Sequence, residues 1–345
     1  MKTIHRWTAV LLLLLLSACT TLPPREGEDN SIDISITPLR TADISALTPQ
    51  WQPLSAGGEL SVFAGRIQNP RLEFWALKLE LGRGKEDRAA GVPAEGAGGS
   101  FGGGSGPEEG PRLRILLGAG AGPSRPGHVP SIRVSSFVRD NGLLAGINTV
   151  PFDPSSSREG EERRVAGIAV AGGRIIAPPV PRYDALVFYR DGGAAIVNQG
   201  ELGEGGLESP PREILHAVGG FHRILSGGEL TERARQRAAG PRYARSAAGL
   251  SGNAGNGGVL YLIVINGGFP GSRGATEAET ALILKRLGAG DALNLDGGGS
   301  SALALRSPRG GIRILNTPSH GGFPGRERAV ALCLGIGTAP VTGGE

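Results

Sequence analysis

The segment 296–301, which reads Asp-Gly-Gly-Gly-Ser-Ser, contains the residues best suited to chemistry in this sequence. Three consecutive glycines let the backbone turn sharply and leave successive N–H groups uncovered, and such a concavity binds anionic oxygens, phosphate above all. Asp296 supplies a carboxylate for catalysis, although the same pattern also fits a plain turn that Asp296 caps. The candidate phosphate-binding residues are Gly297, Gly298, Gly299, Ser300 and Ser301.

A second carboxylate lies upstream, at Glu279. With Thr276, a candidate substrate-binding residue, it has the spacing of a capping box at the start of a helix, which explains both residues without chemistry. If Glu279 and Asp296 instead face one pocket, the pair suits glycosidic cleavage, with one carboxylate as acid or base and the other as nucleophile or water activator. Both interpretations of Glu279 stay open on the sequence.

Three further polar residues are candidates for substrate binding. Arg245 is suited to a bidentate pair with a phosphodiester, or else to a surface salt bridge. Asn148 and Asn294 end or lie within apolar segments, where each amide needs a partner. They bind sugar hydroxyls or tie loops together. The histidines show no metal-ligand spacing, so we expect no metal and no cofactor.

These residues need a scaffold rich in strands. Of 345 residues, 59 are glycine, which indicates many tight turns. The apolar segment 259–265 reads as a strand buried on both faces, and short helices are expected over 131–141 and 276–287. We predict an α+β fold, a strand-dominated single domain with a mixed sheet core and few helices. Further strands are expected around 59–65, 72–80, 112–117, 143–148, 165–197, 292–295, 303–314 and 329–336.

The N-terminus has the layout of a bacterial lipoprotein signal. Lys2 and Arg6 form a basic start, leucines fill 11–16, and Ser-Ala-Cys follows. The apolar run is too short to span a membrane, which needs about 20 apolar residues. We therefore expect a signal peptide over 1–18 and a lipid anchor on Cys19. The folded protein is then expected in the cell envelope, facing the periplasm or the exterior.

Domain organisation follows from composition. Residues 19–31 combine proline, glycine and charge, as in a flexible tether, and 32–345 form the folded domain. Residues 82–111 are rich in Gly, Ser, Pro and Glu, which indicates a disordered insertion between two strands. The net charge of +4 comes from evenly mixed basic and acidic residues, so no nucleic-acid partner is expected. With Cys19 acylated, Cys333 stands alone, and no disulfide can form within the chain.

An ordered series of segments resembles the phosphodiester glycosidase family. The segment 291–301 is nearly letter for letter the family signature, and the resemblance extends over about 60–337, with Thr149 and Pro151 as departures. It implies a hydrolase in which the glycine turn and Arg245 hold phosphate, while Asp296, with Glu279, stabilises the transition state. The other matching segments are 146–153, 245–249, 260–267, 272–279, 315–319 and 326–331.

Two functions are consistent with these features. The first is a hydrolase that cleaves the glycosidic bond of a sugar-1-phosphodiester in a cell-envelope or environmental glycan. The second is a non-catalytic envelope lipoprotein that binds anionic glycans or polymers in the same concavity. The series of family segments favours the enzyme.

Overall fold

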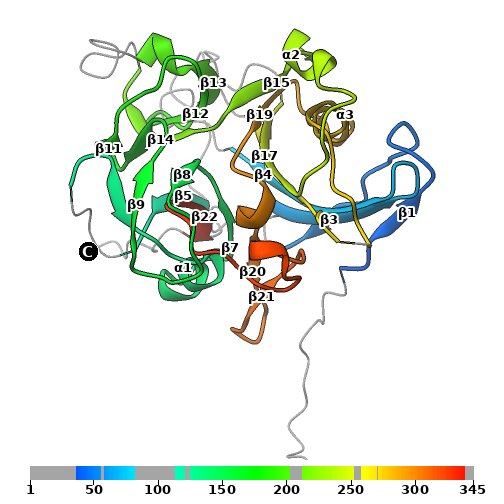
Figure 1. Ribbon diagram of the computed structural model, residues 1–345, viewed down its shortest axis with the longest axis horizontal. Coiled ribbons are helices and arrows are strands. Elements are labelled where there is room, and N and C mark those ends of the chain that lie inside the picture. Colours follow the sequence, from blue (N-terminus) through cyan, green and yellow to red (C-terminus); the bar gives the residue numbers. More distant parts are fainter. Residues whose placement is uncertain are drawn as a thin grey trace, which may run out of the picture. The chain divides into compact units, whose positions relative to one another are not determined.

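The computed structural model describes residues 36–55, 58–81, 113–120, 125–202, 212–251, 258–269 and 271–338 (Figure 1). Residues Ile34–Glu345 form one compact unit. The expected signal peptide over 1–18, Cys19, the tether over 19–31 and the insertion at 82–111 lie outside the described residues. Within the described residues, no helix combines the length and the apolar character needed to cross a membrane.

The largest sheet of the described residues has nine strands and carries the site. Its order is β1-β3-β4-β18-β17-β19-β15-β16, with β2 paired to β3. The β1–β3 pair is parallel and the remaining pairs are antiparallel, so the sheet is mixed. Its strands are β1 (Leu39–Thr41), β2 (Gln52–Pro53), β3 (Leu60–Ile67), β4 (Leu72–Glu80), β15 (His222–Ser226), β16 (Glu229–Leu230), β17 (Arg245–Leu250), β18 (Val259–Ile265) and β19 (Asp291–Asn294).

Three smaller sheets complete the described strands. The first, in the order β11-β10-β14-β12-β13, holds β10 (Ala169–Ala171), β11 (Arg174–Ala177), β12 (Asp184–Tyr189), β13 (Ala194–Asn198) and β14 (Ile214–Gly219). The second, in the order β21-β20-β7-β22-β5, holds β5 (Leu113–Gly118), β7 (Ala145–Asn148), β20 (Leu303–Arg306), β21 (Ile312–Ile314) and β22 (Cys333–Thr338). The third, in the order β6-β9-β8, holds β6 (His128–Pro130), β8 (Phe152–Asp153) and β9 (Glu162–Val165).

Both faces of the nine-stranded sheet are buried. Successive side chains of a strand point to opposite faces, and in β18 Leu262 and Val264 join one hydrophobic cluster while Ile263 and Ile265 join another. The first cluster includes Leu186 and Leu334 from two of the smaller sheets. The prediction that 259–265 is a strand buried on both faces is therefore confirmed.

The other face of the sheet is covered by α3 (Glu277–Leu287), which contributes Ala281, Ile283, Leu284 and Leu287 to the second cluster. Thr276 caps its N-terminus, and Gly288 ends it with a φ of 115°, a left-handed conformation that favours glycine. The expected helix over 131–141 is present as α1 (Val134–Asp140). A third helix, α2 (Glu232–Gln236), was not expected from the sequence.

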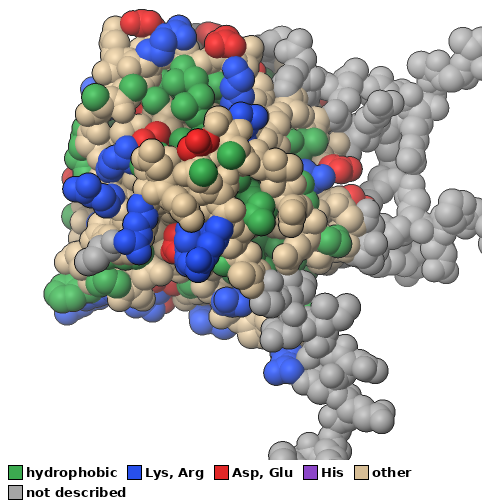
Figure 2. Space-filling model, turned by 90° about the vertical axis from the view of Figure 1, so that its right-hand side faces the viewer, with side chains coloured by type: hydrophobic (Ala, Val, Ile, Leu, Met, Phe, Trp, Pro, Cys, Tyr) green, Lys and Arg blue, Asp and Glu red, His purple; other side chains and the backbone are tan. Residues whose placement is uncertain are grey.

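The observed fold is α+β and dominated by strands, as predicted. Three short 3-10 helices lie among the described loops: η2 (Gln199–Leu202), η4 (Gly298–Ser300) and η5 (His320–Gly322). On the face that Figure 2 shows, basic side chains are dispersed among acidic and apolar ones. Cys333 is buried in β22, where burial raises the pKa of its thiol well above the usual value.

Candidate functional site

The glycine turn lies directly after β19, the strand between β17 and β15. Gly298 has a φ of 59°, which a residue with a side chain adopts at a cost. The Gly298 N–H donates to the carbonyl of Ala244 at 2.7 Å. A Cβ on Gly297 would lie 2.8 Å from the same carbonyl oxygen. The turn therefore needs glycine at both positions to approach the start of β17.

Asp296 begins the turn, and its backbone N–H, its backbone carbonyl and its carboxylate all make hydrogen bonds. Its backbone N–H donates to the carbonyl of Thr149 at 2.9 Å, and its own carbonyl accepts from Asn148 Nδ2 at 2.6 Å. Its carboxylate accepts a hydrogen bond from Ser300. Burial raises the pKa of Asp296 to about 6, while the bond from Ser300 and the charge of Arg328 act in the opposite direction. The carboxyl group is therefore poised to gain or lose a proton near neutral pH.

Arg328 supports this carboxylate from the far side of the turn. Its Nη1 donates to Ser300 Oγ at 3.0 Å, and its Nε donates to His320 Nδ1 at 2.9 Å. A Cβ on Gly299 would lie 2.5 Å from Arg328 Nη2, so the guanidinium occupies the space that a side chain would fill. The sequence did not single out Arg328, although it falls within the family-like segment 326–331.

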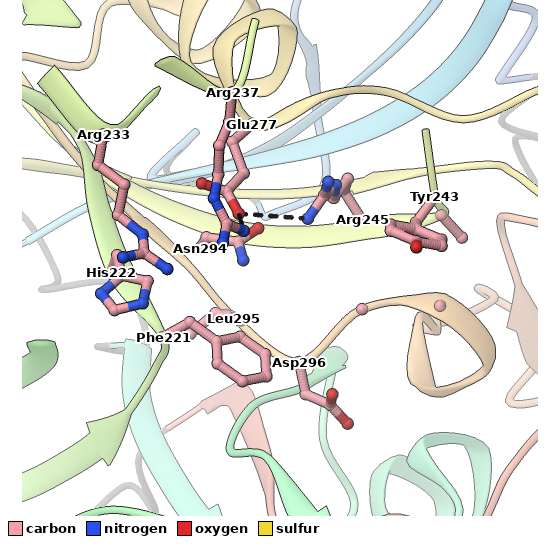
Figure 3. Close-up of a pocket in the computed structure, with 13 residues that line it drawn as sticks. Phe221, His222, Arg233, Arg237, Tyr243, Arg245, Glu277, Asn294, Leu295 and Asp296 are labelled. Atoms are coloured by element: carbon pink, nitrogen blue, oxygen red, sulfur yellow. Dashed lines mark hydrogen bonds and ion pairs between the residues drawn. The ribbon is translucent and has the colours of Figure 1, made fainter. Parts of the chain in front are cut away.

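A cavity of about 290 Å³ opens beside the turn (Figure 3). It contains five of the candidates from the sequence, namely Arg245, Asn294, Asp296, Gly297 and Gly298. The other residues that line it are Phe221, His222, Arg233, Arg237, Tyr243, Ala244, Glu277 and Leu295. In Figure 3 the Asp296 carboxylate points away from Glu277 and Asn294, so it lies at one end of the cavity.

The described lining is rich in arginine. Arg245 is almost buried at the start of β17, where its Nε donates to the carbonyl of Ala275 at 2.9 Å. Arg233 and Arg237 come from α2 and the residue that ends it. Their separation of four residues places them on one side of the helix. The spacing of the two arginines was the only sequence signal for this part of the site. A helix of five residues is too short to show the helical period in the sequence.

Glu277, rather than Glu279, is the second carboxylate in the cavity. It is the first residue of α3 and is 5% exposed. Its Oε1 accepts from Arg237 Nη1 at 3.1 Å and lies 4.0 Å from Arg245 Nη1. Figure 3 shows both contacts between the residues drawn. Nothing in the sequence pattern separates Glu277 from any other acidic residue in the first turn of a helix.

Glu279 has the structural role that the sequence left open. Its Oε2 accepts from the Thr276 N–H at 3.0 Å, and Thr276 Oγ1 accepts from the Glu279 N–H at 3.2 Å. Both carboxylate oxygens also pair with Arg242. Neither Glu279 nor Thr276 lines the cavity. Thr276 and Glu279 therefore form a capping box. Neither joins Asp296 in the lining of the cavity.

Asn148 also ties segments together. It is fully buried, and its Oδ1 accepts from Ser246 Oγ at 2.7 Å and from the Ala302 N–H at 3.2 Å. With the bond from its Nδ2 to Asp296, every polar position of the amide except one N–H is used. Asn148 therefore links β7 and β17 to the turn. Gly299, Ser300 and Ser301 likewise lie outside the cavity lining.

Comparison with known proteins gives one family. The sequence model described as phosphodiester glycosidase matches residues 141–337. Among solved structures, the zebrafish N-acetylglucosamine-1-phosphodiester alpha-N-acetylglucosaminidase catalytic domain, auto-inhibited by its pro-peptide, is similar with a TM-score of 0.52 and 17% identity. That match covers 85% of this chain and 89% of the zebrafish chain.

Two further structures are similar at a TM-score of 0.46. A hypothetical protein from Synechocystis is 13% identical, with 81% of this chain and 62% of that chain covered. A putative exported protein from Burkholderia pseudomallei is 15% identical, with 77% and 74% covered. No curated protein sequence matches the chain.

Proposed function

Because the chain belongs to the phosphodiester glycosidase family, we propose that it hydrolyses the glycosidic bond of a sugar-1-phosphodiester bound between the arginine-lined cavity and Asp296. The substrate is a phosphorylated glycan of the cell envelope or of the environment. Family membership makes the chain a hydrolase. The observation that supports this substrate class is a cavity with an excess of positive charge whose lining includes Asp296, a residue with a raised pKa.

The charges of the cavity suit a phosphodiester. Among the described lining residues, Arg233, Arg237 and Arg245 carry three positive charges against the carboxylates of Glu277 and Asp296. A phosphodiester carries one negative charge, which balances this excess. The Gly298 N–H already donates to the carbonyl of Ala244, so the arginines carry the attraction for the anion. Such fixed groups stabilise an anion without having to reorganise during the reaction.

The reaction breaks the bond between the sugar C1 and the phosphate oxygen. The phosphate leaves with the electron pair, water adds to C1 and loses a proton, and the products are a free sugar and a phosphomonoester. Positive charge develops at C1 in the transition state, and the ionised Asp296 carboxylate stabilises it or attacks it. A phosphate needs little protonation to leave, so the ionised form of Asp296 is the active one.

The pH dependence follows from this assignment. The phosphodiester stays ionised across the accessible range, so Asp296, with a pKa of about 6, sets the acid limb. We expect kcat/KM to be constant above about pH 7 and to fall tenfold per pH unit well below pH 6. Initial rates between pH 4.5 and 9 measure the profile. Activity that instead declines as pH rises through 6 would show that Asp296 acts as an acid.

The test of the proposed function is turnover by the full-length chain, kept soluble in mild detergent. Released sugar is measured with a panel of UDP-sugars and simpler sugar-1-phosphodiesters. Turnover of any of these supports the glycosidase. Binding of the same compounds or of anionic glycans without turnover across the panel would favour the non-catalytic binding protein.

We also propose that acylated Cys19 anchors the chain in the cell envelope, where the enzyme faces the periplasm or the exterior. The support is the sequence of residues 1–19. In a bacterial host, Cys19→Ala is expected to abolish incorporation of a labelled fatty acid and to move the chain out of the membrane fraction. Labelling that persists in Cys19→Ala would place the acyl group elsewhere.

A further inference from the structure

Two buried oxygen atoms of the cavity have no hydrogen-bond donor among the described residues. They are Glu277 Oε2 and Asn294 Oδ1. The Glu277 side chain is 6% exposed and Asn294 is 3% exposed, and both line the cavity. Buried acceptors in folded proteins are nearly always paired, so each such atom requires an explanation.

The Glu277 side chain and the backbone of Asn294 are each held by other contacts. Arg237 donates to Glu277 Oε1, which leaves Oε2 as the oxygen without a partner. Asn294 lies in β19, and its backbone carbonyl accepts from the Phe221 N–H at 2.8 Å. In Figure 3 both side chains lie in the part of the view away from the Asp296 carboxylate. Both atoms are hydrogen-bond acceptors, and a ligand that brings two donors pairs with them.

The chemistry of the two atoms limits the ligand. A phosphodiester has no donor at neutral pH, so the anionic part of a substrate leaves both acceptors unpaired. A metal cation is disfavoured because Arg237 and Arg245 flank Glu277 with positive charge. The described residues also contain no group of three or more His, Cys, Asp or Glu arranged to hold a metal. Hydroxyl groups are neutral donors and match both atoms.

We propose that Glu277 and Asn294 form the sugar-recognition subsite, in which their free oxygens accept hydrogen bonds from two hydroxyl groups of the glycosyl unit. This inference rests on the proposed function, since it assigns the sugar of the same substrate. In this arrangement the arginines of the cavity bind the phosphate, and the two acceptors bind the sugar. A site that accepts a hydrogen bond from a substrate hydroxyl discriminates strongly against analogues without it.

Glu277→Gln tests the subsite with little change in shape. The remaining amide oxygen keeps the bond from Arg237, and the new NH₂ group replaces the acceptor at Oε2 with a donor. For UDP-glucose we expect kcat/KM to fall about 100-fold, as for a lost hydrogen bond to a charged group. For the monodeoxy analogue of UDP-glucose that lacks the bound hydroxyl, the same substitution is expected to cost less than about threefold. Asn294→Leu is expected to show the same pattern with a different deoxy position.

The control is Glu232→Gln on α2. Glu232 is exposed, pairs with Arg235 and lies outside the cavity lining. The same chemical change there is expected to leave kcat/KM within about twofold. Equal losses for UDP-glucose and all its monodeoxy analogues in Glu277→Gln, or no loss at all, would overturn the subsite while leaving the glycosidase intact.

Binding separates this inference from the proposed function if no substrate turns over. By calorimetry, UDP-glucose is expected to bind the wild type more tightly than UDP does, and Glu277→Gln is expected to remove that difference. Equal affinity for UDP and UDP-glucose in the wild type would reject the subsite. Stabilisation of the wild type, but not of Glu277→Gln, by Ca²⁺ or Mg²⁺ alone would assign the acceptors to a cation and also reject it.

Discussion

Replacement of Asp296 by asparagine is expected to lower kcat about 10³- to 10⁵-fold, the range found when a reacting carboxylate or its equivalent is removed. The amide keeps the shape of the side chain, and the backbone bonds to Thr149 and Asn148 do not involve it. The loss therefore reports the missing charge rather than a rebuilt turn. Steady-state rates with the best substrate of the panel measure it.

The same variant is expected to be no less stable than the wild type at pH 8. The pKa of Asp296 is raised from 3.8 to about 6, so the folded chain binds this proton more tightly than the unfolded chain does. The stabilising effect of the proton is present below pH 3.8 and lost as pH rises through 6. Asparagine removes this dependence. We expect a gain of about 1–3 kcal/mol in the free energy of unfolding at pH 8 that disappears near pH 4.

Glu279→Gln is the matched control for this prediction, because it makes the same change at the carboxylate of the capping box. It is expected to keep kcat within about threefold and to cost about 1–2 kcal/mol of stability, since Arg242 loses its ionic partner. Full activity in Asp296→Asn would remove Asp296 from the reaction. A large loss of kcat in a stably folded Glu279→Gln would restore Glu279 as a reacting group.

Asn148→Leu is expected to lower the free energy of unfolding by about 3–5 kcal/mol, because a buried polar group that loses its partner costs about 1–3 kcal/mol. Leucine has nearly the same size but no polar atoms. It leaves the carbonyl of Asp296, the hydroxyl of Ser246 and the N–H of Ala302 without the bonds that Asn148 makes. Urea unfolding followed by circular dichroism measures the change.

The matched control is Asn141→Leu. Asn141 is exposed at the end of α1, where its Nδ2 donates to the carbonyl of Phe137 at 2.9 Å. The same substitution is expected to cost less than about 1 kcal/mol there, because water replaces the lost bond. If Asn148→Leu is equally mild, the amide does not hold the turn, and a role in binding becomes the better explanation for Asn148.

Local patterns were sufficient for much of the scaffold and for the centre of the site. The apolar segment 259–265 is too uniform to face water on either side, so its burial on both faces could be predicted. The spacing of Thr276 and Glu279 predicted the helix start, because a capping box is closed by residues three apart. The glycines of 297–299 likewise predicted a tight turn after a strand.

The contacts around Asp296 and the cavity depend on the packing of segments that are distant in the sequence. Arg328 reaches Ser300 from 28 residues away, and Arg237 reaches Glu277 from 40 residues away. Such pairs form only when strands and helices pack against one another. The sequence around a residue does not predict which distant segment will contact that residue. The role of Arg328 was therefore missed, although its segment was singled out.

The two glutamates of α3 show most clearly what the sequence determines and what only the tertiary structure determines. The sequence by itself determined that a helix begins after Thr276 with two acidic residues in its first turn. Residues two apart point about 200° apart around a helix, so the two glutamates cannot both face the cavity. The capping bond directs Glu279 back to Thr276, and the packing of α3 on the sheet directs Glu277 into the cavity. Only the tertiary structure decided which carboxylate joins Asp296, because it alone fixes how the helix is rotated against the sheet.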